Sequence, residues 1–261
     1  MKTVPLFRED AYLRECDAVV TRVLDDGVEL DRTVFYPLGG GQAGDSGVLV
    51  LPDGGAIAVT DARKSKREDA TPDDTLHLLD PTADWKTRLR VGMPVRAQID
   101  WSRRYRHMRF HTATHLLCAV VHELVDGCSI TADYARLDFA MTALLAKEQV
   151  QEGLDRLVAG AHPVSSEWIT DEEMRANPQL VKSMSVSPPM GFGRVRLLRV
   201  HEVDLQACGG THVKNTSEIG AVRVSKVEKK SARTRRVVLE FDEAKSGSSG
   251  FPGPARHRQN G

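Results

Sequence analysis

The first hundred residues carry short apolar segments that are interrupted by turns at close intervals. Strands are predicted where apolar and β-branched residues follow one another, and Asp-Gly and Gly-Gly pairs mark turns between them. The predicted strands cover residues 18–24, 28–30, 47–51, 56–59, 75–79 and 95–100. The segments 47–51 and 56–59 flank a Pro-Asp-Gly-Gly turn and are predicted to form a hairpin. Short strands at this spacing indicate a small β-barrel over about residues 1–100.

A helical periodicity begins after the last of these strands. Apolar and buried-type residues recur at helical spacing, at Trp101, Tyr105, Met108, Thr112, His115 and Ala119. Asp100, directly before this segment, suits the N-cap of a helix because its carboxylate accepts from free backbone N–H groups. The pattern predicts a long, buried helix from Trp101 to about Val125.

Helices and strands are mixed in the rest of the chain. Strands are predicted at 135–141 and 195–200, a polar helix at 147–162, and a closing hairpin at 219–227 and 235–241. We therefore predict an α+β fold, with a barrel at 1–100 and a second α+β domain at 101–243. Residues 244–261 are rich in serine, glycine and proline and are predicted to be a disordered tail.

Composition and charge exclude several classes of protein. The 261 residues include 36 basic and 36 acidic side chains, so net charge points to no partner. No apolar run approaches the length that crosses a bilayer. The four cysteines are scattered without disulfide spacing, and no secretory signal is visible. A cytoplasmic protein without a membrane partner is expected; both a monomer and a homodimer are compatible with the sequence.

Two short motifs, nearly a hundred residues apart, carry the candidate metal ligands. The first is His-Thr-Ala-Thr-His at 111–115, which places two histidines on one face of the predicted helix. The second is Cys-Gly-Gly-Thr-His at 208–212, whose glycines let the backbone turn sharply. One thiolate and three imidazoles suit tetrahedral Zn²⁺. The predicted zinc ligands are His111, His115, Cys208 and His212. Four protein ligands also match a closed structural site, so a catalytic and a structural zinc both remain open.

Other segments suggest contacts to a ligand. Phe-Tyr-Pro-Leu-Gly-Gly-Gly-Gln at 35–42 permits close backbone approach at Gly39, Gly40 and Gly41 or a tight turn, and Gln42 is the side chain there that could bind a substrate. The arginines before His111, among them Arg104 and Arg109, have two interpretations: they either contact a phosphate group near the metal or pair with acidic neighbours and lock the helix. Asp204 either orients a metal-bound histidine or is a turn residue. The basic hairpin at 223–236 is either a phosphate contact or a solvated strand face.

Together these segments resemble one family closely. His-Thr-Ala-Thr-His-Leu-Leu at 111–117 and Ala-Cys-Gly-Gly-Thr-His-Val at 207–213 are similar to the metal motifs of the alanyl-tRNA synthetase editing domain. The glycine-rich segment at 35–42 resembles that of the free-standing AlaX proteins, and Arg-Leu-Asp-Phe at 136–139 and Lys-Asn-Thr-Ser-Glu-Ile-Gly at 214–220 fit as well. The resemblance runs from about residue 6 to 243 and is to the medium-length AlaX type with its N-terminal barrel.

The resemblance implies a hydrolase that removes the wrong amino acid from mischarged tRNA(Ala), chiefly serine and also glycine, and spares Ala-tRNA(Ala). It assigns Zn²⁺ to the four ligands above and the loop from Gly39 to Gln42 to the substrate pocket. One position departs from the family pattern. Many relatives carry a glutamine in the loop before the 136–139 strand, where the best alignment places Ser129.

The chemistry of the site suggests further roles. The hydroxyls of Thr112, Thr114 and Thr211 lie near the predicted metal and would read a serine side chain. The backbone N–H groups of Gly209 and Gly210 would stabilise an oxyanion. Two alternatives stay open: a zinc hydrolase of another ester, and a non-catalytic tRNA-binding module stabilised by zinc. The absence of a His-Glu-x-x-His motif argues against the zinc hydrolase of another ester, because residue 112 is threonine and not glutamate.

Overall fold

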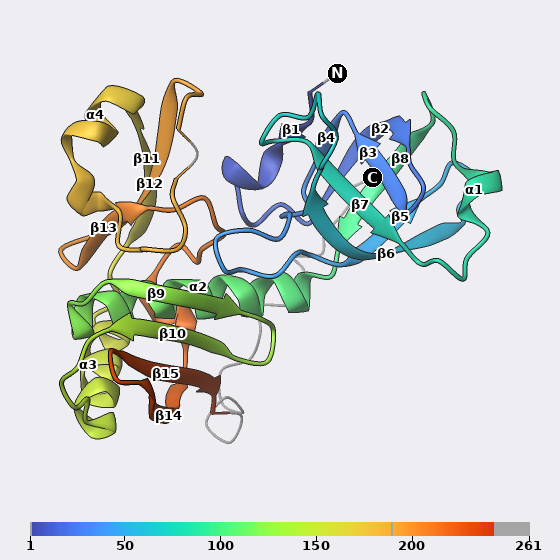
Figure 1. Ribbon diagram of the computed structural model, residues 1–261. Helices are drawn as coiled ribbons and strands as arrows, with labels where there is room; N and C mark the ends of the chain where they lie inside the picture. The colour runs from blue at the N-terminus through green and yellow to red at the C-terminus, as the bar shows by residue number, and fades with distance from the viewer. Residues whose placement is uncertain (1, 189, 243–261) are drawn as a thin grey trace, which may run out of the picture.

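The structure is a computed structural model that describes residues 2–188 and 190–242. Figure 1 shows a barrel on one side and two further sheets on the other, with the helix α2 (Trp101–Val121) running between them. The predicted tail at 244–261 lies outside the described residues.

The barrel is built from six antiparallel strands that all lie between residues 15 and 99. Their order around the barrel is β2-β3-β7-β6-β5-β8. The bounds are β2 Glu15–Val23, β3 Gly27–Leu30, β5 Gly47–Val50, β6 Ala56–Lys64, β7 Thr75–Leu79 and β8 Pro94–Ile99. The predicted hairpin is confirmed, since β5 and β6 pair from Gly47 with Val59 to Val50 with Ala56. Alternate residues of each strand point inward, and side chains such as Val20, Leu49 and Ala97 form its core.

Short elements flank the barrel. A two-stranded parallel pair joins β1 to β4, and a short helix lies between β7 and β8. Their bounds are β1 Val4–Pro5, η1 Leu6–Arg8, β4 Arg32–Thr33 and α1 Trp85–Arg88.

The helix α2 carries the first metal motif and starts where the barrel ends. Its N-cap is Asp100, as predicted, because the Asp100 carboxylate accepts from the Arg103 N–H at 3.1 Å. The helix ends at Val121 rather than near Val125. His122 adopts a left-handed conformation with φ of 58°, and Val125 already belongs to strand β9. Every residue from Phe110 to Cys118 is buried, so α2 is enclosed on all sides around the metal motif.

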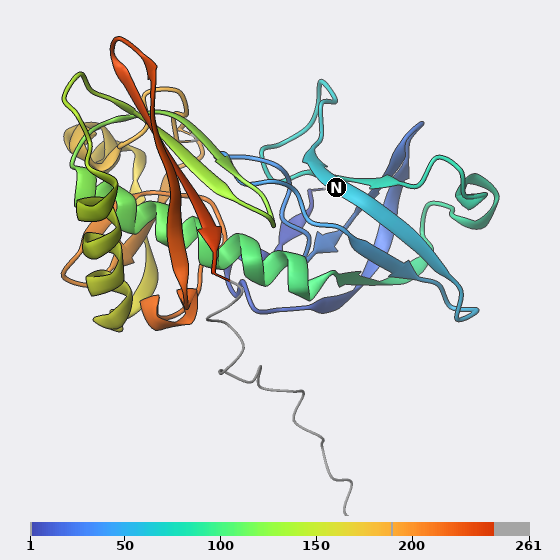
Figure 2. The same ribbon diagram turned by 90° about the horizontal axis from the view of Figure 1, so that it is seen from below.

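A four-stranded antiparallel sheet of order β14-β15-β10-β9 covers one side of α2, with helix α3 packed beside α2. Figure 2 shows α2 and α3 against this sheet from below. The predicted closing hairpin is confirmed as the pair of β14 and β15. The bounds are β9 Val125–Ile130, β10 Ala135–Ala140, α3 Lys147–Ala159, η3 Thr216–Ile219, β14 Val222–Ser231 and β15 Thr234–Phe241.

A second, three-stranded antiparallel sheet has the order β11-β12-β13 and lies over the C-terminal half of α2 in Figure 1. Only its central strand was predicted. The bounds are β11 Val164–Thr170, α4 Asp171–Ala176, η2 Pro178–Leu180, β12 Arg194–Val200 and β13 Asp204–Ala207. Strand β13 leads directly into the second metal motif, so this sheet delivers Cys208 to α2.

The predicted mixed α and β structure with a small barrel is confirmed. The barrel and the part that follows have separate apolar cores, and Trp101 packs against both of them. The division of the chain into domains at residue 100 therefore stays a prediction. Within residues 2–188 and 190–242, no helix is both long and apolar enough to cross a bilayer.

Candidate metal centre

Four side chains from the two motifs meet at one point. The ligand atoms of His111, His115, Cys208 and His212 all lie within 4.8 Å of one another. Cys208 Sγ is 3.5 Å from His111 Nε2 and 3.3 Å from His212 Nε2. Ligands bound tetrahedrally to one zinc ion are separated by roughly 3.3–3.7 Å, because each bond is about 2.0–2.3 Å long. The spacing of these atoms fits a zinc ion.

Each histidine of the cluster is held through its Nδ1 atom by a different element. His111 Nδ1 lies 2.7 Å from Gln42 Oε1, and His115 Nδ1 lies 3.1 Å from Asp204 Oδ2. The third, His212, has its Nδ1 3.2 Å from the hydroxyl of Thr112. A partner that accepts from Nδ1 leaves the Nε2 lone pair for a metal, as in most metal-ligating histidines.

Surrounding hydrogen bonds fix the direction of two of these contacts. The backbone N–H of Thr211 donates to Gln42 Oε1 at 3.1 Å, so the amide oxygen faces His111 and Nδ1 must carry the proton. The Thr112 hydroxyl donates to the carbonyl of Met108 at 2.9 Å, so its oxygen accepts from His212. Both imidazoles are thereby set in the tautomer that ligates through Nε2.

Electrostatics favour the ligating form of the cysteine. Burial alone would raise the pKa of the Cys208 thiol, but the adjacent His111 and His212 lower that pKa well below its ordinary value. The Gly210 N–H also points to Cys208 Sγ at 3.4 Å. The thiolate, which is the form that binds zinc, is therefore stabilised.

The pKa values of two histidines of the cluster, His212 and His115, shift in opposite directions. Burial and the neighbouring His111 lower the pKa of His212 well below its ordinary value. Burial would lower the pKa of His115 as well, but Asp204 and Cys208 raise it to about 9. Zinc requires a neutral imidazole, so a zinc ion held by this cluster would have to displace the extra proton of His115.

The glycine-rich segment forms a tight turn that docks on strand β9. Gly39 and Gln42 exchange backbone hydrogen bonds around Gly40 and Gly41, whose φ angles are 58° and 84°. Two consecutive positive φ angles are the geometry of a type I′ turn, which favours glycine. A Cβ on Gly41 would also lie 2.6 Å from the sulfur of Cys128. The turn brings Gln42 to His111.

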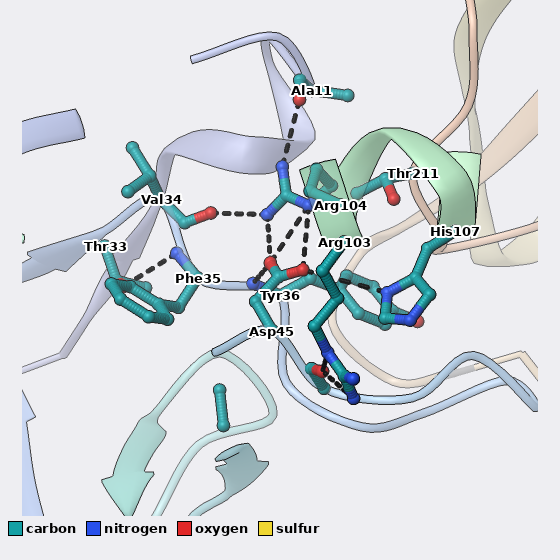
Figure 3. Close-up of polar contacts among 12 residues, drawn as sticks. Ala11, Thr33, Val34, Phe35, Tyr36, Asp45, Arg103, Arg104, His107 and Thr211 are labelled. Carbon is teal, nitrogen blue, oxygen red and sulfur yellow. Dashed lines mark hydrogen bonds and ion pairs between the residues drawn. The ribbon is translucent and has the colours of Figure 1, made fainter. Parts of the chain in front are cut away.

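A buried ion pair ties this segment to the start of α2, as Figure 3 shows. Arg104 donates from Nε to both carboxylate oxygens of Asp45, at 3.1 and 2.9 Å, and donates further to the carbonyls of Val34 and Ala11. Asp45 Oδ2 accepts in addition from the backbone N–H of Tyr36 at 2.6 Å. Both side chains of the pair are fully buried. This pair holds the two ends of the glycine-rich segment against the helix.

The candidate metal centre forms part of the wall of a cavity of about 780 Å³. His111, His115 and Cys208 line it, together with Thr114 and Gly209. Much of the remaining lining comes from the N-terminal segment, the glycine-rich turn, the segment 181–188 and the face of strands β11 and β12. A substrate entering this cavity reaches three of the four candidate ligands.

Comparison with known proteins agrees with this geometry. The family described as the threonyl and alanyl tRNA synthetase second additional domain matches residues 195–238. The alanyl-tRNA editing protein AlaX-M of Methanosarcina acetivorans is 33% identical over 246 residues, which cover 90% of this chain and 97% of that protein. The AlaX-M protein of Saccharolobus solfataricus is 33% identical over 239 residues, with the same coverage. The chain belongs to the AlaX-M family. The alanine–tRNA ligase of Pyrococcus abyssi is 34% identical over 93% of this chain, which corresponds to 26% of that ligase.

In this AlaX-M family member, the two arginines that were predicted to bind substrate have partners within the fold. Arg104 is fully buried and bound to Asp45, so it locks the helix instead of contacting a substrate. The guanidinium of Arg109 stacks on Phe241 at 3.9 Å from the ring centroid and donates to the carbonyl of Ile219 at 2.9 Å. It is not among the residues that line the cavity.

Two other residues that were predicted to bind substrate, Gln42 and Ser129, do not line the cavity. Gln42 is fully buried and outside the cavity lining, because its amide is bonded to His111 and Thr211. On strand β9 the cavity is lined by Cys128 rather than Ser129, since adjacent strand residues point to opposite faces. Of the three glycines, Gly39 and Gly40 line the cavity and Gly41 lies under Cys128.

The predicted catalytic residues separate into two groups. Thr114, Gly209 and Gly210 line the cavity. The others lie behind the ligands: Thr112 and Asp204 hold His212 and His115, and the Thr211 hydroxyl accepts from Gln42 Nε2 at 2.9 Å. The Gly210 N–H faces the Cys208 sulfur, which removes it as an oxyanion donor. The Gly209 N–H has no hydrogen-bond partner among the described residues.

The basic hairpin is largely neutralised within the fold. Asp138 accepts from Lys230 at 2.8 Å and from Arg236 at 2.7 Å. Arg235 is buried and donates to the loop carbonyls of Thr142 and Ala143. These contacts favour the interpretation of the hairpin as a structural strand pair over a phosphate contact.

The sequence analysis missed the side chains that β11 and β12 present to the cavity. Among them are Trp168, Arg194 and Arg196. Arg196 on the strand predicted at 195–200, with Arg194 directly before that strand, was a visible signal. The strand that carries Trp168 was not predicted, so no partner could be assigned.

Proposed function

We propose that the chain is a zinc-dependent aminoacyl-tRNA deacylase that hydrolyses the ester of mischarged tRNA(Ala). Serine is the principal amino acid removed, glycine the second, and Ala-tRNA(Ala) is spared. Membership of the AlaX-M family, whose named relatives are alanyl-tRNA editing proteins, supports the editing reaction. The observation that carries the proposal is the cluster of three imidazoles and one cysteine, three of whose four side chains line a cavity.

The donor set fits zinc, and His111, His115, Cys208 and His212 would hold it. A bound zinc ion would supply Lewis-acid polarisation of the ester or a bound water of lowered pKa. The chain itself contributes the orientation of each imidazole, through Gln42, Asp204 and Thr112. These three partners sit behind the ligands and leave the cavity side open to a substrate.

Selection of serine is assigned to Thr114. Its hydroxyl donates to the carbonyl of His111 at 2.7 Å, so its oxygen can only accept from a further partner. The hydroxyl of a seryl ester is a donor that satisfies this oxygen, and the methyl group of alanine is not. A buried polar atom left without its partner disfavours the wrong substrate, so the site discriminates against Ala-tRNA(Ala).

The backbone at Gly209 supports the reaction at the ester itself. Gly209 lines the cavity beside Cys208, and its N–H has no partner among residues 2–188 and 190–242. A free backbone N–H next to the reacting carbonyl stabilises the oxyanion that forms during attack by water. We assign this donor to Gly209 alone, since Gly210 donates to Cys208 Sγ.

The test uses the whole protein with Ser-tRNA(Ala), Gly-tRNA(Ala) and Ala-tRNA(Ala), with and without a chelator, and follows the released amino acid. Loss of serine with alanine spared, which the chelator stops and added zinc restores, supports the proposal. No hydrolysis of any of the three by folded, zinc-loaded protein rejects it.

One observation favours a second candidate, a tRNA-binding module with structural zinc. All four tetrahedral positions are filled by protein side chains, the pattern of a closed site. This candidate predicts tight binding of tRNA(Ala) without deacylation, and a chelator that unfolds the protein. A zinc hydrolase of another ester predicts cleavage of small amino acid esters as fast as of Ser-tRNA(Ala).

A further inference from the structure

The cavity extends far beyond the metal centre, along one face of the three-stranded sheet. Ser166, Trp168, Arg194 and Arg196 all line it, and they lie on neighbouring positions of β11 and β12. Trp168 is paired directly with Arg196 across the two strands. An aminoacyl group at the metal would leave this part of the cavity for the nucleotide portion of a substrate.

An aromatic side chain with a stacked arginine lies on this face. Trp168 is 39% exposed, and the guanidinium of Arg194 lies 4.3 Å from its ring centroid. A large exposed aromatic in a cavity offers a flat surface on which a nucleobase stacks, and an arginine beside it adds charge for phosphate. The two side chains together match the chemistry of an RNA end.

A second aromatic side chain lies nearby in the cavity lining. Phe192 is 60% exposed and sits between Gly191 and Gly193, whose φ angles are 89° and 84°. The N–H groups of both glycines donate to Asp171 Oδ2, at 3.1 and 2.9 Å. The turn is thus fixed by hydrogen bonds to the first residue of α4, and Phe192 of the turn lines the cavity.

The charge of the lining is positive. Two acidic side chains line the cavity, Glu9 and Asp73. Six basic side chains also line it: Lys2, Arg8, Lys64, Lys182, Arg194 and Arg196. Asp73 is already paired with Lys2 and Arg8. A polyanion is attracted to such a surface, although the whole chain carries no net charge.

Arg196 connects this face to the metal centre. Its Nη1 donates to the carbonyls of Cys208 and Gly210, both at 3.0 Å. The chain of contacts therefore runs from the loop that carries Cys208, through Arg196, to Trp168 and Arg194. A ligand that follows this face is led directly to the candidate metal ligands.

We propose that the face formed by Trp168, Arg194 and Phe192 binds the single-stranded 3′ end of the aminoacylated RNA, with Trp168 stacking on a terminal base and Arg194 contacting a phosphate. Arg196 is a positioning residue that holds the loop 208–212 beside this face through the carbonyls of Cys208 and Gly210. The inference deepens the proposed function and rests on it for the identity of the RNA. It places the RNA end on the sheet β11-β12-β13 and not on the β14-β15 hairpin.

The test measures binding separately from hydrolysis. The probe is an uncharged, fluorescein-labelled RNA hexamer that ends in C-C-A, titrated with full-length, zinc-loaded protein and followed by anisotropy. Trp168→Ala is expected to weaken binding at least about fivefold, and Trp168→Phe to restore most of it, because stacking tolerates any aromatic ring. Arg194→Ala is expected to weaken binding and to lower its dependence on salt by the loss of about one phosphate contact.

A matched control lies on the same strand. Arg199 of β12 pairs with Glu167 and does not line the cavity. Arg199→Ala is expected to bind the hexamer as the wild type does. Wild-type binding by both Trp168→Ala and Arg194→Ala would overturn the inference, and so would equal weakening by Arg199→Ala.

The same variants separate this inference from the proposed function. In deacylation of Ser-tRNA(Ala), Trp168→Ala is expected to raise KM with little change in kcat. Trp168-dependent binding of the hexamer without deacylation by the wild type would reject the deacylase and keep the RNA-end site. Active deacylation with KM unchanged in Trp168→Ala and Arg194→Ala would reject the RNA-end site alone.

Discussion

Gln42 Oε1 lies 2.7 Å from Nδ1 of His111, although the two residues are 69 positions apart in the chain. The glycine-rich turn, which resembles a substrate loop in sequence, thus supports the metal centre from behind. The amide oxygen of Gln42 also accepts from the backbone N–H of Thr211, and its amide nitrogen donates to the Thr211 hydroxyl. One buried side chain therefore aligns both metal motifs.

Replacing this amide is expected to weaken zinc binding. Gln42→Ala removes the acceptor for His111 Nδ1, and loss of such a partner lowers metal affinity by about 10- to 100-fold. Gln42→Glu keeps an acceptor for His111 Nδ1, loses the donor to Thr211 and adds a negative charge beside the imidazole, so its zinc affinity is expected to exceed that of Gln42→Ala. Competition with a chromophoric chelator measures the dissociation constants. Gln98→Ala, on the barrel surface, is the matched control; equal affinities of Gln42→Ala and this control would contradict the assignment.

The two glycines of the second motif are expected to differ sharply. A Cβ on Gly210 would lie 2.1 Å from His111 Cε1, whereas a Cβ on Gly209 meets nothing within 4 Å. Gly210→Ala must therefore displace the His111 ring and lose bound zinc, and Gly209→Ala retains it. Zinc content per chain, measured by atomic absorption on folded protein, distinguishes them. Full zinc content in Gly210→Ala would show that the ring is free to move.

Serine selection is expected to depend on the Thr114 hydroxyl. Thr114→Val keeps the shape of the side chain and removes the acceptor, so kcat/KM for Ser-tRNA(Ala) is expected to fall about tenfold. Gly-tRNA(Ala), which offers no hydroxyl, serves as the internal reference and is expected to change less. Zinc affinity is measured alongside, because Thr114 lies between His111 and His115. An equal fall for both substrates would remove Thr114 from selection.

The buried His77 of the barrel is expected to make the fold sensitive to acid. Burial lowers its pKa from 6.5 to about 4. The ring is held neutral between the carbonyl of Val28 and the hydroxyl of Thr33. The unfolded chain binds a proton between pH 6.5 and 4 and the folded chain does not, so stability falls as the pH drops through this window.

At pH 5 this group alone is expected to cost about 1–2 kcal/mol of unfolding free energy relative to pH 7. Urea unfolding of the wild type and of His77→Gln at both pH values isolates the contribution, because the variant has no titrating ring. If the two proteins lost the same free energy between pH 7 and pH 5, His77 would not be the titrating group.

The cluster of candidate metal ligands was predictable because the signals of its two halves are local. His111 and His115 lie four positions apart on a helix, and Cys208 and His212 flank a glycine turn, so each pair is set by its own segment. The barrel and the closing hairpin were also visible, since each depends on alternation within short strands. The chemistry of four soft and borderline donors then pointed to one ion.

The partners of these ligands could not be found in the same way. Two interpretations of Arg104 were open, and Asp45, 59 positions away, decides between them only in the folded chain. The choice of Cys128 over Ser129 depends on strand register, where a shift of one residue exchanges the faces. The early end of α2 depends on the single left-handed residue His122.

Three residues hold the imidazoles: Gln42 from the barrel side, Thr112 from α2 and Asp204 from strand β13. The histidine pair of α2 is therefore made about ninety residues before the segment 204–212 that completes its coordination shell. A nascent chain that ends after α2 contains only His111 and His115 of the four candidate ligands, and His115 lacks its partner Asp204. Such a chain would not hold a zinc ion tightly. Zinc binding at this cluster would consequently require that residues 204–212 have been synthesised and have folded against α2.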